Sequence, residues 1–132
     1  MADEHQSFID AVLDAAPEVE DALRALGEDI APDLEIPVLW LGFVGRAVAT
    51  CLPGMSADAA GAVFATVEHH LVHGSESMST GVATGFLEAV AGAVSAGRLD
   101  PGLVAGVLGP ESRAYVDAWD QFTLGRSSLG GS

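Results

Sequence analysis

Apolar residues recur at helical spacing along most of this chain, and no stretch alternates apolar and polar residues as a half-buried strand does. Val63, Phe64, Val67 and Leu71 stand at positions i, i+1, i+4 and i+8, the spacing of one buried helix face. Proline and glycine divide such stretches into segments of helical length. We therefore predict an all-α fold. The expected form is a compact bundle of six or seven helices, with a stack of helical hairpins as the alternative.

Capping and helix-breaking residues place the boundaries of the predicted helices. Two helices are divided at Pro17, and Gly27 ends the second of them. Ser77 or Ser79 begins the fifth helix, which ends at Gly97. The other boundaries predict helices over 37–51, 57–73, 101–108 and 110–124.

The length of 132 residues indicates one domain. We assign residues 1–124 to a single helical domain, in which the N-terminal helical pair, about 1–35, is acidic. Residues 125–132 have the glycine and serine content of a flexible tail.

Two features predict which helix surfaces pack closely. The segment from Val38 to Val48 is apolar nearly all round, which is typical of a helix buried in a core. Gly81 and Gly85 are one turn apart in the fifth helix, where they would let another helix approach closely. GC-rich coding is the alternative explanation for glycine at these positions.

Acidic residues gather at the N-terminus. The first 35 residues hold eleven of the nineteen acids and only one of the five arginines, Arg24. The formal net charge of −14 disfavours nucleic acid and anionic membrane as partners, and it favours a basic protein. The alternative is a solvated face that only maintains solubility. The residues predicted to bind the partner are Asp10, Asp14, Glu18, Glu20, Asp21, Glu28 and Asp29.

We expect neither an export signal nor a membrane segment in this chain. Cys51 is the single cysteine and cannot form an internal disulfide, and the N-terminus is acidic, so we expect a cytoplasmic protein. The longest apolar run, 36–52, contains Arg46 and is too short to cross a bilayer.

The sequence offers one candidate metal motif, at Glu68 to His73. His69 and His73 share a helix face, but Glu68 precedes the first histidine instead of following it, and no third ligand is evident. We therefore expect His69, His70 and His73 to bind no metal, and we predict no cofactor.

Glu68 and Glu88 form a candidate polar site. Each flanks the apolar face of its helix, and the two helices should be antiparallel neighbours. Two carboxyl groups can perform acid–base chemistry when their environments separate their pKa values. The alternative is that both reach water or accept hydrogen bonds from an arginine such as Arg46.

The second half of the chain, Val67 to Gly125, resembles a family of small uncharacterised bacterial helical domains, some of which occur in toxin-immunity loci. The similar residues are Val82-Ala83-Thr84-Gly85-Phe86-Leu87-Glu88 and Leu108-Gly109-Pro110-Glu111-Ser112-Arg113-Ala114-Tyr115. The resemblance implies an all-α fold and an immunity or accessory role, and it transfers no functional residue.

These observations lead to three functional hypotheses. The first is a non-enzymatic acidic binding protein, such as an immunity protein that neutralises a basic toxin or nuclease. The second is a structural or scaffold subunit, or a homo-oligomer, that associates through the Val38–Val48 helix and the Gly81/Gly85 face. The third is a metal- or carboxylate-dependent enzyme that uses Glu68, Glu88 and the histidines.

Overall fold

The computed structural model describes residues 4–26 and 37–124, and within these ranges the chain forms helices and no strand. The prediction of a compact all-α bundle is confirmed. The described elements are α1 (Glu4–Ala15), α2 (Glu18–Ala25), α3 (Pro37–Cys51), the 3₁₀ turn η1 (Leu52–Gly54), α4 (Ala57–His73), α5 (Glu76–Gly81), the π-helix η2 (Val82–Leu87), α6 (Glu88–Ser95), α7 (Pro101–Ala105) and α8 (Pro110–Leu124).

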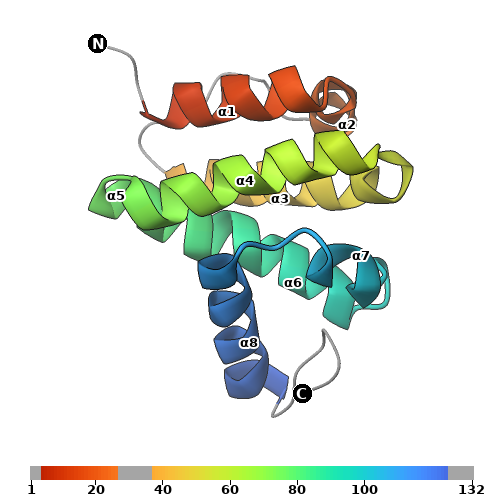
Figure 1. The fold of residues 1–132 in the computed structure, drawn as a ribbon. Coiled ribbons are helices and arrows are strands. Elements are labelled where there is room, and N and C mark those ends of the chain that lie inside the picture. The colour runs from red at the N-terminus through yellow and green to blue at the C-terminus, as the bar shows by residue number, and fades with distance from the viewer. Residues whose placement is uncertain (1–3, 27–36, 125–132) are drawn as a thin grey trace.

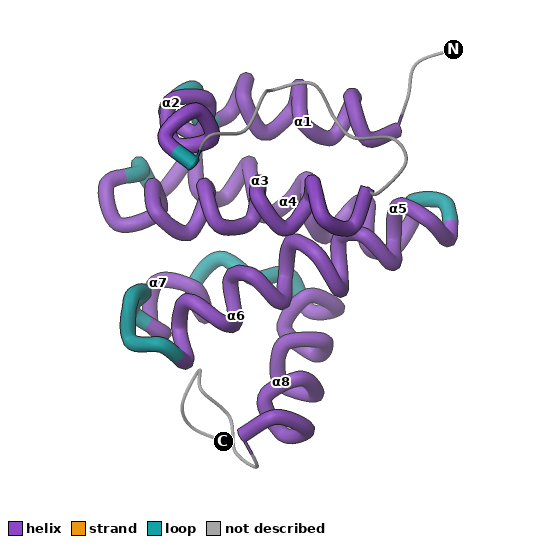
Figure 2. The backbone as a smooth tube through the Cα atoms, turned by 180° about the vertical axis from the view of Figure 1, so that it is seen from behind, coloured by secondary structure: helices purple, strands orange, loops and turns teal. Residues whose placement is uncertain are grey.

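The helices are arranged in layers (Figure 1). Helices α1 and α2 form one outer layer, with α1 packed on α4 and α2 packed on α3. The continuous rod α5–η2–α6 lies on the other side of α3 and α4. Helix α8 contacts this rod and points steeply away from α1 and α2. The view from behind shows the same order (Figure 2). The acidic helical pair and the last helix therefore occupy opposite ends of the described structure.

Side-chain caps begin α4 and α7 where the sequence predicts them. The hydroxyl oxygen of Ser56 accepts from the Ala59 N–H at 3.1 Å, and the Asp100 carboxylate accepts from the Gly102 N–H at 2.9 Å. The predicted start of the fifth helix at Ser77 or Ser79 is wrong. Ser75 caps that helix by accepting from Met78, whereas the Ser79 hydroxyl donates to the Leu71 carbonyl at 2.7 Å.

Three phenylalanines centre the core. Phe8 of α1, Phe64 of α4 and Phe86 of η2 are fully buried or nearly so. The Phe86 ring meets the other two edge to face, with ring centroids 5.8 and 5.9 Å apart. Such pairs each contribute about 0.5–1.5 kcal/mol beyond their buried area. These contacts join α1, α4 and the central rod into one core.

Glycine brings α3 against the central rod. A Cβ atom at Gly81 would lie 2.6 Å from Leu41 Cδ1, and one at Gly45 would lie 2.6 Å from the Phe86 carbonyl oxygen. The predicted close approach of a helix at Gly81 is therefore confirmed, and α3 is the helix that approaches. A Cβ atom at Gly42 would lie 3.8 Å from the Gly85 carbonyl oxygen, so Gly85 lies at the same crossing.

Candidate functional site

Helices α1 and α2 expose most of their carboxylates. Asp10 and Asp14 of α1 and Glu18 and Asp21 of α2 are exposed, and we call these four residues the acidic face. Glu20 is half-buried. Two other predicted contact residues, Glu28 and Asp29, lie outside the described residues. The acidic face belongs to the outer layer that is farthest from α8 (Figure 1).

Little positive charge opposes the acidic face from its own helices. The Arg24 guanidinium, the only one in α1 and α2, pairs with Glu20 at 2.6 Å and not with a member of the face. The Gln6 side-chain amide donates to Asp10 at 2.9 Å, which orients one carboxylate without neutralising it. Asp10 and Asp14 are one helical turn apart, so their repulsion destabilises α1 by a few tenths of a kcal/mol.

Cys51 lies beside this acidic face and senses its charge. The Cys51 thiol donates to the Glu18 carbonyl oxygen at 3.6 Å, a contact that ties the end of α3 to the start of α2. Burial raises the pKa of the Cys51 thiol, and the negative charges of Glu18 and Asp21 raise this pKa further. The thiol is therefore a poor nucleophile at neutral pH.

Glu68 caps a helix that is distant in sequence. The Ser112 N–H and hydroxyl donate to Glu68 Oε1 at 2.9 and 2.8 Å, and the Glu111 N–H donates to Oε2 at 3.0 Å. These N–H groups belong to the first turn of α8, where a helix has no internal acceptors. Burial acts to raise the pKa of the Glu68 carboxyl, but the hydrogen bonds from Ser112 and Glu111 outweigh burial and lower this pKa below its ordinary value.

Gly109 makes room for this cap. It occupies the capping position of α8, where its carbonyl oxygen accepts from the Arg113 N–H at 2.9 Å. A Cβ atom at Gly109 would lie 2.5 Å from Glu68 Oε1 and 2.6 Å from its Cδ. Gly109 has no side chain that could cap the helix itself. Because this space is free, the Glu68 carboxylate from α4 can reach the N–H groups of α8. Glu68 and Gly109 thus act together.

Glu88 also anchors α8, at a second point. Its carboxylate accepts from the Tyr115 hydroxyl at 2.6 Å. Burial and the hydrogen bond to Glu88 raise the pKa of the Tyr115 phenol far above its ordinary value. The hydrogen bonds of Glu68 and Glu88 lead to different residues of α8. Arg46, the predicted alternative partner, instead lies over the Phe43 ring at 6.0 Å from its centroid. Both carboxylates thus have a structural role as anchors of α8.

The three histidines near the end of α4 are His69, His70 and His73. His69 and His73 are exposed with ring centroids 5.2 Å apart, and His70 donates from Nδ1 to the Thr66 carbonyl at 2.9 Å. The His70 ring also meets Phe8 edge to face at 5.3 Å. Among residues 4–26 and 37–124, no three His, Cys, Asp or Glu side chains gather at metal-binding distance.

An open hollow of about 640 Å³ lies between α4 and the chain that enters α8. Its lining combines Phe64 and Val72 with His69, His73 and Glu111. Val72, at 47 % exposure, is one of two large hydrophobic side chains that the described surface exposes; the other is Leu103. The hollow contains Glu68, whose oxygens are already committed to α8. The hollow therefore offers surface for contact, and the other acidic residue in its lining is the exposed Glu111.

The surfaces that the scaffold hypothesis assigns to subunit contacts, on α3 and around Gly81, pack against other helices of the same chain. Trp40, Leu41, Val44 and Val48 of α3 are buried in the core. Gly81 contacts Leu41 and is likewise buried.

No helix in the described part of the chain is both long enough and apolar enough to span a membrane.

Sequence reasoning missed a second charged feature. Arg46 of α3 and Arg98, in the turn after α6, line one hollow of about 200 Å³. Two features of the sequence pointed to Arg98: the chain has only five arginines, and Arg98 directly follows Gly97. In the structure Gly97 has φ 77°, closes α6 and sets the position of Arg98.

No protein-family model, curated protein or solved structure matches this chain. The resemblance of residues 67–125 to small bacterial helical domains therefore remains a proposal.

Proposed function

We propose that the protein is a non-enzymatic binding protein whose acidic face docks a basic protein partner. The observation that carries the proposal is the exposure of Asp10, Asp14, Glu18 and Asp21 in one layer, where the single arginine is already paired with Glu20. A cationic partner would relieve the repulsion among these carboxylates and would be steered to them by the field of a chain with net charge −14.

The positions of the other carboxylates support a binding role. Glu68 and Glu88 hold α8 in place, so the two best acid–base candidates are engaged in structure. Exposed acids on a packed helical core suit a protein that masks a positively charged surface. Neutralisation of a basic toxin or nuclease is the specific form that we propose, and the resemblance of residues 67–125 to domains from immunity loci points the same way. We expect such a protein to act in the cytoplasm.

The test compares two variants of equal charge. Asp14→Asn/Asp21→Asn removes two charges from the acidic face, and Asp58→Asn/Glu76→Gln removes two exposed charges from α4 and α5. Basic proteins from the host that bind the wild type are purified, and their Kd values for all three proteins are measured by titration calorimetry at low and high salt.

We expect the face variant to bind about tenfold more weakly than the control, with a smaller salt dependence. Equal weakening by the two variants would show that net charge alone attracts basic proteins, and the proposal would then fail. It would also fail if the host contains no basic protein that binds the wild type with a Kd below about 10 μM.

A further inference from the structure

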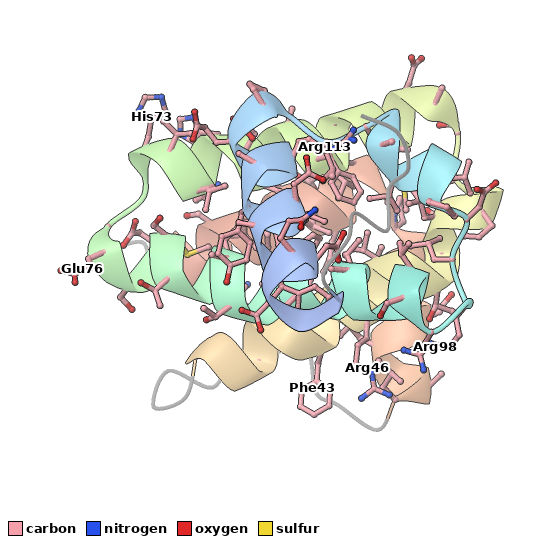
Figure 3. The ribbon with its side chains drawn as sticks, turned by 90° about the horizontal axis from the view of Figure 1, so that it is seen from below. Phe43, Arg46, His73, Glu76, Arg98 and Arg113 are labelled. Carbon is pink, nitrogen blue, oxygen red and sulfur yellow. The ribbon has the colours of Figure 1, made fainter. Side chains whose placement is uncertain are left out.

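The second charged feature of the molecule is a hollow of about 200 Å³ that two arginines share. Arg46 comes from α3 and Arg98 from the turn after α6, and both are exposed. Figure 3 shows their side chains next to each other, with Phe43 beside Arg46. The hollow is also lined by Leu26, Ala49, Thr50, Ala89 and Ala93. It therefore has two cationic groups, one hydroxyl and a small apolar wall.

The backbone fixes where each arginine begins. The Gly97 N–H donates to the Val94 carbonyl at 3.0 Å, and the Arg98 N–H donates to the Ala93 carbonyl at 2.9 Å. With Gly97 at φ 77°, these bonds form the Schellman turn that closes a helix, and this turn holds Arg98 at the rim of the hollow. Arg46 lies within α3, and its guanidinium is 6.0 Å from the centroid of the Phe43 ring.

The pairing of these arginines differs from that of the other two arginines that the structure describes, Arg24 and Arg113. Arg24 and Arg113 each pair with a carboxylate one helical turn away on their own helix. Among the described residues, no carboxylate forms an ion pair with Arg46 or Arg98. The C-terminal dipole of α6 favours one cation at Arg98, but it does not account for a second guanidinium in the same hollow. Two like charges that share a hollow repel each other until an anion lies between them.

We propose that the Arg46/Arg98 hollow is a binding site for a small oxyanion, and that a phosphate monoester is its ligand class. Guanidinium groups bind phosphate oxygens through two parallel hydrogen bonds, and two of them balance the charge of a dianion. The Thr50 hydroxyl donates to the Arg46 carbonyl at 3.0 Å and keeps lone pairs and exposure toward solvent. The alanine wall suits a short carbon chain attached to the phosphate. Nucleic acid does not fit, because the net charge of −14 repels a polyanion.

The test is a titration followed by NMR, for which a protein of 13.4 kDa is well suited. Sodium phosphate is added at constant ionic strength, with sodium chloride as the reference, and the side-chain Nε–H signals of the arginines are followed. We expect the Arg46 and Arg98 signals to shift with phosphate and to saturate at millimolar concentration, while Arg113 stays unchanged. Propyl phosphate is then titrated in the same way, and we expect a lower Kd than for inorganic phosphate.

Single-charge variants give the specificity of the site. Arg46→Gln and Arg98→Gln should each raise the Kd for phosphate about tenfold, whereas Arg113→Gln, which removes the same charge from α8, should leave it unchanged. Arg98→Lys keeps the charge but loses the paired donors, so its Kd for phosphate should lie between those of the wild type and Arg98→Gln. Dispersed backbone spectra confirm that each variant is folded.

Three results would overturn the proposal. These are equal shifts with chloride and phosphate, binding that survives both single substitutions, and equal weakening by Arg113→Gln. The site does not depend on the acidic face, so loss of partner binding in Asp14→Asn/Asp21→Asn leaves this titration unaffected.

Discussion

Replacing Glu68 by glutamine should weaken the hydrogen bonds that hold the start of α8 against α4. Glutamine keeps one acceptor oxygen but places an NH₂ group near the N–H donors of Glu111 and Ser112. A hydrogen bond to a charged group contributes about 1.5–3 kcal/mol and a neutral one about 0.5–1.5 kcal/mol. Loss of the carboxylate charge at a helix N-terminus removes a further 0.3–1 kcal/mol or so. We expect E68Q to lower the free energy of unfolding by about 2 kcal/mol and Tm by about 7 °C.

The loss should depend on pH with a defined sign. The folded state lowers the pKa of the Glu68 carboxyl, so Glu68 stabilises the fold fully above the ordinary glutamate pKa of about 4.3. That contribution is lost as pH falls through the lower pKa of the folded state. The difference in Tm between wild type and E68Q should therefore be largest at pH 7 and should shrink toward pH 3, which thermal unfolding by circular dichroism measures at both pH values.

Two further variants separate the cap from a general effect of charge. Glu76→Gln removes an exposed glutamate from the first turn of α5 and should cost less than 1 kcal/mol. Gly109→Ala places a methyl group against the Glu68 carboxylate, so it should destabilise the wild type but do so far less in a Glu68→Ala background. Equal losses for E68Q and E76Q, or strictly additive effects of the Gly109 and Glu68 changes, would refute the cap.

Two other predictions test the acidic face and the helix crossing. Glu18→Gln/Asp21→Asn should lower the pKa of Cys51 and speed its alkylation at pH 8. Raised salt should act in the same direction on the wild type. An unchanged pH profile of the alkylation rate would contradict this prediction. Gly45→Ala should destabilise the fold by more than 2 kcal/mol because its methyl group would meet a backbone oxygen of η2, whereas Gly92→Ala, which meets open space, should stabilise it by about 0.5–1 kcal/mol in urea unfolding.

Local chemistry was sufficient to predict much of the fold. Pro37, Ser56 and Asp100 mark helix starts through caps or through a fixed φ, which depend only on residues a few positions away. The apolar stripes predicted the buried faces for the same reason. Gly81 identified a close helix crossing, although the sequence could not show which helix approaches there.

The errors arise where distant residues decide. Serine occurs at 75, 77 and 79, and the Ser79 hydroxyl donates to the Leu71 carbonyl near the end of α4, whereas Ser75 caps the helix. Glu68 and Ser112 are 44 positions apart, so no local pattern reveals that one caps the helix of the other. The π-helix η2 adds residues to a turn without changing the apolar pattern of its sequence, so periodicity alone does not detect it.

The distribution of charge argues that recognition by this protein must be judged by position and not by total charge. A chain with net charge −14 attracts any cation, so weakening after removal of an arbitrary acid carries little information. The informative comparisons hold the charge constant and move its place, as Asp14/Asp21 against Asp58/Glu76 does. The same reasoning applies to Arg98 against Arg113, because the mean field of the chain disfavours bound anions everywhere. An anion that still distinguishes these two arginines must be held by the local geometry of the hollow, since the long-range field acts against it at both.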